Sequence, residues 1–122
     1  MLFRSIKVPD LYSSFMVRKS AVDAVGGIAT CYTACGYREE TDLTLRMTLA
    51  GFNQYIVPAA VVWHVRASQG GERRSKRAWE VLRVKNEQLF QKRIRSWCDD
   101  PAKQFAMLWE VALTEVRSNR KG

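Results

Sequence analysis

The sequence predicts an α+β fold in one domain that spans residues 1–122. Apolar residues recur at the spacing of an amphipathic helix in two stretches, 39–50 and 73–97. Two short apolar runs lie between them, at 54–57 and 60–65, and are typical of strands. Helices therefore outnumber strands, and two strands are too few for a self-sufficient α/β sheet.

The N-terminal part is expected to be an extended segment followed by a short helix. Residues 1–17 alternate weakly between apolar and polar and include Pro9, which favours extended chain or an edge strand. Residues 18–25 can form a short helix, which the double glycine at 26–27 ends because glycine adopts the left-handed conformation without a steric cost. Residues 28–37 show no period, and we expect a loop there.

The second helix is expected over 39–50, ending at Gly51. Its first turn is acidic, which complements the positive end of the helix dipole. One side of this helix is apolar and should pack against the rest of the domain. That side consists of Leu43, Met47 and Ala50, with Leu45 and Leu49 beside them.

The two short runs, Gln54–Val57 and Ala60–Val65, should form the strand pair on which the helices pack. A long helix is expected next, over 73–97. Its inward side should consist of Val81, Leu82, Leu89, Phe90 and Ile94. Residues 98–122 are expected to form a last helix and a tail, with Asp100 as the N-cap before a proline.

The composition is that of a soluble globular protein, 47% hydrophobic and 26% charged, with a net charge of +8. The excess is concentrated in residues 66–95, which hold ten basic and three acidic residues. Net charge bears on partners rather than on the fold. A basic balance favours anionic partners, such as nucleotide phosphates, nucleic acid or an acidic membrane surface.

The cysteines and the N-terminal sequence indicate the cellular compartment of the protein. Three cysteines, Cys31, Cys35 and Cys98, are an odd number, which argues against a closed disulfide framework. We expect them to be buried thiols in the cytosol. The sequence has no apolar run of about 18 residues, as a transmembrane helix needs, and no apolar core of a signal peptide. We therefore expect a cytoplasmic protein, with peripheral attachment to a membrane as a further option.

Three carboxylates lie within four positions at the start of the second helix: Glu39, Glu40 and Asp42. Helix capping and dipole neutralisation would use only one or two of them. The later apolar run ends in Trp63-His64, which contains the only histidine of the chain. An acidic cluster followed by a Trp-His strand end indicates one half of an active site.

Several segments together resemble a known family. Residues 15–97 look like the C-terminal half of a family 2 glycosyltransferase, an inverting enzyme of the GT-A fold. The domain would then consist of an extended segment (1–17), a glycosyltransferase-like region (18–97) and a C-terminal helix and tail (98–122). The segments that carry the resemblance are Phe15–Ala21 with Val25-Gly26-Gly27, Arg38–Arg46, Ala50–Phe52 with Val57–His64, and Lys85-Asn86 with Leu89-Phe90.

The resemblance implies roles for the three acids. Glu40 would be the general base, which deprotonates an acceptor hydroxyl that then attacks the anomeric carbon of a nucleotide sugar. Glu39 is the second choice for this role, and Asp42 would contact the acceptor or support the start of the helix. Arg46 also belongs to the acidic motif of the resemblance. The alternative is that Arg46 simply forms an ion pair with Asp42, one helical turn before it.

The resemblance also implies a set of substrate-binding residues. His64 would contact the diphosphate or its cation, Trp63 would stack on a sugar or a base, and Arg73 and Arg74 would meet the diphosphate. The alternatives stay open. A lone histidine can simply satisfy local hydrogen bonds, Trp63 is favoured as a core residue, and the two arginines can belong to a solvated helix face.

The sequence lacks the Asp-x-Asp motif with which this family holds Mn²⁺ or Mg²⁺ on the diphosphate, and it lacks a glycine-rich phosphate loop. We expect only the acceptor-side half, without the nucleotide-binding βαβ half. The isolated chain should then be inactive and bind no cofactor or metal. Mn²⁺ or Mg²⁺ with a nucleotide sugar would enter only if a partner supplies the missing half.

Three interpretations follow: a truncated or split transferase, a decayed fragment that still folds, or a domain recruited for binding. Without the nucleotide-binding half, strand edges and apolar surface would be exposed, and another chain should cover them. We therefore expect a homodimer or a complex with a separate nucleotide-binding half. The alternative function is a basic non-catalytic binding module for nucleic acid or an anionic membrane surface. Nucleic acid is the less favoured partner, because no helix-turn-helix, zinc or RNA-binding aromatic motif is present.

Overall fold

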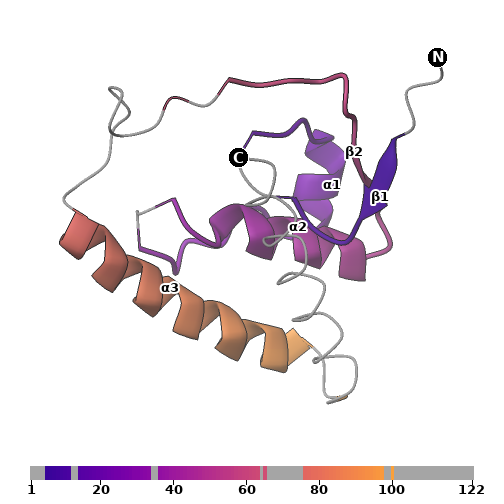
Figure 1. The fold of residues 1–122 in the computed structure, drawn as a ribbon. Helices are drawn as coiled ribbons and strands as arrows, with labels where there is room; N and C mark the ends of the chain where they lie inside the picture. Colours follow the sequence, from indigo (N-terminus) through magenta and orange to yellow (C-terminus); the bar gives the residue numbers. More distant parts are fainter. Residues whose placement is uncertain are drawn as a thin grey trace.

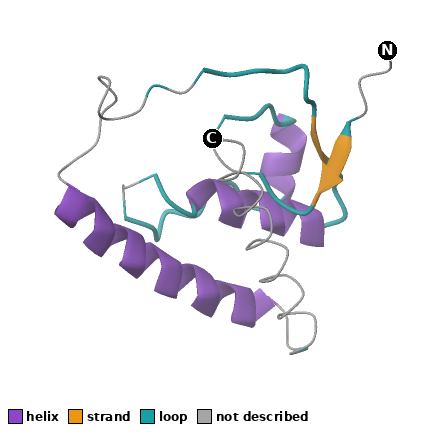
Figure 2. Cartoon of the chain, viewed as in Figure 1, coloured by secondary structure: helices purple, strands orange, loops and turns teal. Residues whose placement is uncertain are grey.

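The computed structural model describes residues 5–11, 14–33, 36–63, 65, 76–97 and 100. Within these residues the chain forms three helices and one antiparallel pair of strands, which confirms the α+β class (Figure 2). The elements in chain order are β1 (Ile6–Val8), α1 (Lys19–Ala24), α2 (Glu39–Leu49), β2 (Gln54–Ile56) and α3 (Lys76–Trp97).

The helix α2 occupies the middle of the molecule (Figure 1). The helix α3 runs along one side of it, and α1 and the two strands lie on the other side. This arrangement gives α2 two apolar contacts. One cluster joins Leu45 to Phe90 and Ile94 of α3, and the other joins Leu43 and Met47 to Ala21 of α1.

The strand pair differs from the expected one. β2 pairs with β1 from the N-terminal segment, with Ile6 opposite Ile56 and Val8 opposite Gln54. The expected strand over 60–65 is wrong, since its described residues have no strand structure and are exposed. The chain turns at Pro58, where the amide of Ala60 donates to the carbonyl of Val57.

Side chains of α2 and β2 hold the N-terminal segment in place, which places it beside β2 as the partner strand. The Thr44 hydroxyl accepts a hydrogen bond from the amide of Leu11 at 2.9 Å and lies 2.9 Å from its carbonyl oxygen. The Gln54 side-chain amide donates to the carbonyls of Pro9, at 3.1 Å, and Thr44, at 2.6 Å. The contacts with Pro9 and Leu11 join residues more than thirty positions apart, so no local pattern indicates them.

The first two helices end where the glycines predict. Gly26 and Gly27 have φ angles of 80° and 82°, and the amide of Gly27 donates to the carbonyl of Val22. At the end of α2, Gly51 has a φ of 93° and the amide of Phe52 donates to the carbonyl of Met47. These left-handed turns satisfy carbonyl groups that a helix end would otherwise leave unpaired.

The expected inward residues are only partly correct. On α2, Leu43, Leu45 and Met47 are buried, whereas Leu49 and Ala50 are exposed. On α3, Phe90 and Ile94 are buried, but Val81 is 52% exposed. Val81 precedes Phe90 by nine residues, which at about 100° per residue places it on the opposite side of the helix.

Three further expectations concern the cysteines, the last helix and membrane-spanning segments. Cys31 is exposed, so its expected burial is wrong. Cys35, Cys98 and the expected helix that begins after Asp100 lie outside the described residues. Among the described helices, none is both long and apolar enough to cross a bilayer.

Candidate functional site

The three acids of the predicted site lie in the first turn of α2, but their surroundings differ. Asp42 is completely buried, while Glu39 and Glu40 are partly exposed. The preceding residue, Arg38, makes no side-chain capping bond, although it occupies the N-cap position. The acids therefore begin the helix without a conventional side-chain cap, and each has to be considered separately.

Asp42 is the most extensively bonded side chain of the site. It accepts hydrogen bonds from the hydroxyl of Tyr32 at 2.6 Å and from Nε of Arg46 at 2.7 Å. Arg93 of α3 donates to both carboxylate oxygens, at 2.6 Å from Nε and at 3.3 Å from the second nitrogen. Of the two roles expected for Asp42, these bonds describe the support of the helix start. Its contact with an acceptor stays a prediction.

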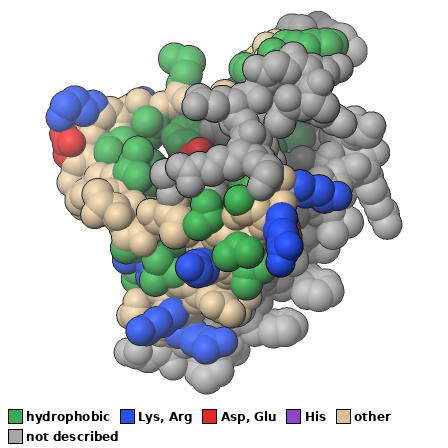
Figure 3. All heavy atoms as spheres, turned by 90° about the vertical axis from the view of Figure 1, so that its left-hand side faces the viewer, with side chains coloured by type: hydrophobic (Ala, Val, Ile, Leu, Met, Phe, Trp, Pro, Cys, Tyr) green, Lys and Arg blue, Asp and Glu red, His purple; other side chains and the backbone are tan. Residues whose placement is uncertain are grey.

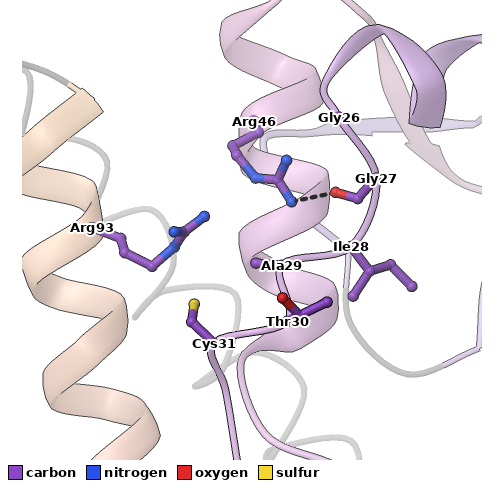
Figure 4. Close-up of a pocket in the computed structure, with 8 residues that line it drawn as sticks. All are labelled: Gly26, Gly27, Ile28, Ala29, Thr30, Cys31, Arg46 and Arg93. Atoms are coloured by element: carbon purple, nitrogen blue, oxygen red, sulfur yellow. Dashed lines mark hydrogen bonds between the residues drawn. The ribbon is translucent and has the colours of Figure 1, made fainter.

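The expected pairing of Arg46 with Asp42 is confirmed by this geometry. Arg46 also donates to the carbonyl of Val25 at 2.6 Å and to that of Gly27 at 2.7 Å (Figure 4). One guanidinium group thus ties the acidic motif to the double-glycine turn. Two of the segments that carry the family resemblance are joined by direct hydrogen bonds.

The ion-pair cluster, which consists of Asp42, Tyr32, Arg46 and Arg93, also affects the pKa values of Tyr32 and Arg93. Burial raises the pKa of Tyr32, and the hydrogen bond that Tyr32 donates to Asp42 raises it further. Its hydrogen bond with Asp42 raises the pKa of Arg93 as well. The raised pKa values favour a neutral, donating hydroxyl on Tyr32 and a cationic Arg93.

Glu39 is the acid whose environment fits a proton acceptor. Its Oε2 atom is buried and has no hydrogen-bond partner among the described residues. Burial raises the pKa of Glu39, and the negative charge of Glu40 acts in the same direction. Hydrogen bonds from the backbone amides of Glu39, Tyr37 and Gly36 oppose the rise without cancelling it. A carboxylate with a raised pKa takes up a proton more readily near neutral pH.

A second cluster holds the loop before α2. Its Asn86 belongs to a segment that carries the resemblance, but sequence analysis assigned Asn86 no role in holding this loop. Asn86 of α3 accepts hydrogen bonds from the amide and hydroxyl of Thr33, at 2.9 and 2.7 Å. Its own amide donates to the carbonyls of Thr33, at 3.1 Å, and Tyr37, at 2.9 Å. Asn86 lies four residues before the buried Phe90, and a polar residue on an apolar helix face was the signal available in the sequence.

Arg38 completes this second cluster. It has the left-handed φ of 77°, which is uncommon for a residue with a side chain. Its Nε donates to Glu87 at 2.6 Å, and its guanidinium lies 4.8 Å from the ring centroid of Phe90. Burial alone would raise the pKa of Glu87, but the bond and charge of Arg38, with bonds from Gln91 and Tyr37, lower it.

A cavity of about 400 Å³ lies beside the buried ion-pair cluster. Its walls are Gly26, Gly27, Ile28, Ala29, Thr30, Cys31, Arg46 and Arg93. Neither Glu39 nor Glu40 belongs to these walls. The predicted base and this cavity are therefore separate features.

Of the predicted substrate-binding residues, only Trp63 is described, and it is not among the residues that line the cavity. Trp63 is 89% exposed, so the alternative that places it in the core is wrong. His64, Arg73 and Arg74 lie outside the described residues, and their roles stay predictions. Within the described part of the chain, no group of three metal-binding side chains could hold a cation.

Comparisons of this chain with protein-family models, with curated proteins and with solved structures gave no match. A functional proposal therefore depends on the residues and geometry described above.

Proposed function

We propose that this chain is a glycosyltransferase-related protein that provides the acceptor side of an inverting glycosyl transfer. The Glu39–Glu40 pair would act as the general base. The observation that carries the proposal is the buried, unpartnered Oε2 of Glu39, which lies in the acidic first turn of α2 and whose carboxyl has a raised pKa. Asp42 is committed to its cationic partners and would serve as support.

The chemistry assigned to the pair is a single proton transfer coupled to substitution. An acceptor hydroxyl gives its proton to the carboxylate while its oxygen forms a bond to the anomeric carbon of the donor sugar. The bond from that carbon to the nucleoside diphosphate breaks, and the diphosphate leaves with the electron pair. A positioned base of this kind contributes about 10²–10⁴-fold to a rate.

The two clusters supply the rigidity that such a base needs. Asp42 joins α2 to Arg93 of α3, and Asn86 joins α3 to the loop before α2. The first turn of α2 and the loop before it are therefore both held by hydrogen-bonded side chains of α3. A catalytic group works only when surrounding contacts fix its orientation.

The donor side requires another polypeptide segment or chain. The sequence contains no Asp-x-Asp, and both oxygens of Asp42 already accept hydrogen bonds from arginine. With only Glu39 and Glu40 left in this turn, the described acids do not fit Mn²⁺ or Mg²⁺, which take several oxygen ligands. We propose that a nucleotide-binding partner supplies the cation and that this chain alone is inactive.

Acceptor binding can be tested on the chain alone by NMR of the glutamate carboxyl carbons. During titration with a panel of mono- and disaccharides, we expect shifts at Glu39 and Glu40 and none at Glu80, an exposed glutamate on α3. The Glu40→Gln variant should weaken the response of Glu39. Saccharides that leave the first turn of α2 unaffected would contradict the proposal.

Donor binding is tested separately by calorimetry with UDP and Mn²⁺. We expect no binding tighter than about millimolar, a level that corresponds to only about 4 kcal/mol of attraction. Tighter binding would show that this chain itself holds the donor and would overturn the assignment to the acceptor side.

A second candidate function rests on the outer side of α3, where Arg77, Lys85, Lys92 and Arg95 are all exposed. Figure 3 shows Lys and Arg side chains interspersed with hydrophobic ones on one face of the molecule. The acids of α3 are already paired, Glu80 with Arg83 and Glu87 with Arg38. This basic side could bind an anionic membrane surface or nucleic acid.

Salt titration distinguishes this second candidate. Binding to a nucleic acid should weaken steeply as salt increases, because phosphate contacts release counterions. Binding to vesicles should require anionic lipid, at about 1 kcal/mol per cation near the surface. A Lys85→Gln/Lys92→Gln variant should lose binding in either case. Unchanged binding by this variant would exclude the outer side of α3 as the surface that binds nucleic acid or anionic lipid.

A further inference from the structure

The cavity beside Asp42 has a marked excess of hydrogen-bond donors. Figure 4 shows that Arg46 of α2 and Arg93 of α3 approach it from two sides, with the loop 26–31 as its third wall. Two guanidinium groups meet a single buried carboxylate there, that of Asp42. With the Tyr32 hydroxyl as a neutral donor, the described side chains Arg46, Arg93 and Asp42 together carry a net charge of +1.

The acceptors around the arginines are already in use. Arg46 donates to Asp42 and to the carbonyls of Val25 and Gly27. Arg93 uses Nε and one terminal nitrogen on Asp42. Its other terminal nitrogen makes no hydrogen bond to any described residue, and the Arg93 side chain is 27% exposed.

The loop adds further donors. The amides of residues 28–31 form no backbone hydrogen bonds within the described part of the chain. The side chain of Thr30, an exposed residue, contributes a hydroxyl to the same wall. Consecutive free amides beside a guanidinium are the groups with which proteins bind phosphoryl oxygens.

We propose that this cavity binds a small phosphorylated molecule through Arg93 and the loop 28–31. The volume of about 400 Å³ exceeds that of a phosphate ion and lies at the lower end of small-molecule sites. The phosphoryl group would accept hydrogen bonds from Arg93 and the loop, and the attached organic group would occupy the remaining space. The proposal does not depend on the transferase function, because it uses neither Glu39 nor Glu40.

The direct test is an NMR titration of the whole chain with inorganic phosphate, glucose 1-phosphate and glucose, at matched ionic strength in sodium chloride. We expect saturable shifts of the amides of 28–31 with both phosphates. Tighter binding of the ester would indicate that a phosphorylated metabolite, rather than free phosphate, is the ligand. Shifts that chloride reproduces, or that occur away from this loop, would overturn the proposal. Equal shifts with glucose would also overturn it.

Variants of the loop test the site without disturbing the core. Thr30→Glu places a carboxylate beside Arg93 and should weaken phosphate binding by at least about tenfold, whereas the neutral Thr30→Gln should stay within about twofold. Thr30 is exposed, so both variants should fold, as circular dichroism would verify. Phosphate binding by Thr30→Glu that equals that of the wild type would overturn the assignment.

The matched control for charge is Lys92→Gln, which removes an exposed cation next to Arg93 in sequence. It should bind phosphate within about twofold of the wild type, while Arg93→Lys, which keeps the charge but loses the planar donor fork, should bind less tightly. Equal losses in Lys92→Gln and Arg93→Lys would mean that only general attraction by the basic surface is present, and would overturn the proposal.

Discussion

At the residue scale, Asp42 shows how a buried charge is accommodated. It is completely inaccessible, yet Tyr32, Arg46 and Arg93 donate to both of its oxygens. Removing water from a carboxylate is unfavourable unless paired donors replace the lost hydrogen bonds. The three partners lie in the loop before α2, in α2 itself and in α3, so one side chain couples three segments.

Asp42→Asn should therefore destabilise the fold by about 3 kcal/mol or more, because two partly buried arginines lose their counter-charge. Urea unfolding followed by circular dichroism measures the effect. The matched control is Asp23→Asn, which breaks the exposed pair with Lys19 and should cost less than about 1 kcal/mol. Similar losses in both variants would show that Asp42 does not have the central role assigned to it.

Glu39 should make the stability of the fold depend on pH. Its folded pKa lies above the ordinary value of 4.5, so the native state binds more protons than the unfolded state above that pH. Stability should fall as pH rises from 4.5 through the folded pKa. Glu39→Gln should remove this fall and be more stable than the wild type at neutral pH, as chemical denaturation at several pH values would show.

Glu80 provides a control of opposite sign. Its hydrogen bond with Arg83 lowers the pKa of Glu80, so its contribution is present above 4.5 and is lost as pH falls through the folded value. Glu80→Gln should therefore lose stability at neutral pH relative to acid pH. A Glu39→Gln variant with the same sign as Glu80→Gln would contradict the raised pKa of Glu39.

At the scale of the elements, the start of α2 is positioned by side chains of α3. Arg38 has an unfavourable left-handed backbone conformation. Its guanidinium donates a hydrogen bond to Glu87 and lies over the ring of Phe90. Asn86 of α3 fixes the loop that precedes α2 through its hydrogen bonds with Thr33 and Tyr37. The proposed base therefore depends on the packing of two helices that are distant in sequence.

Asn86→Ala should detach this loop. The carbonyls of Thr33 and Tyr37 would lose their donor, and each buried group left unsatisfied costs about 1–3 kcal/mol. We expect faster amide hydrogen exchange in residues 33–38 and at the start of α2. Gln88→Ala is the matched control, since Gln88 is exposed on the same helix. Exchange that is equally fast in both variants would argue against the role of Asn86.

At the scale of the whole molecule, the uncharged segment 57–63 is exposed. It follows β2 and runs across the top of the view in Figure 1, and its large apolar residues include Val61, Val62 and Trp63, at 81, 64 and 89% exposure. Much of the remaining surface is basic in a chain of net charge +8, which disfavours contact between copies elsewhere. A contiguous apolar patch of this kind usually marks an interface.

Self-association should therefore occur through this segment. In sedimentation experiments we expect the wild type to be heavier than its 14.0 kDa monomer. Val61→Lys and Trp63→Lys should shift it towards the monomer, because a lysine in the contact would have to be desolvated. Val81→Lys, at an equally apolar exposed site on α3, should have no effect. A wild type that stays monomeric over the accessible concentration range would exclude this interface.

The sequence by itself determined the elements whose signals are local. The apolar spacing and the glycines located α1 and α2 to within a residue or two, because helix periodicity and the left-handed turn depend only on neighbouring residues. The same local reasoning identified the pair formed by Asp42 and Arg46, which lie one helical turn apart. It also singled out Glu39, though not the buried state of its oxygen.

Only the tertiary structure decided the contacts between distant segments. It paired β2 with β1 instead of with residues 60–65, joined Asp42 to Arg93 across fifty-one positions, and formed the open cavity between α2, α3 and the loop 26–31. Such contacts form where long-range packing satisfies buried polar groups, and that satisfaction depends on the positions of all the partners at once. A run of apolar letters such as Val61-Val62-Trp63 can be a paired strand or an exposed segment, and only the presence or absence of a partner in space distinguishes them.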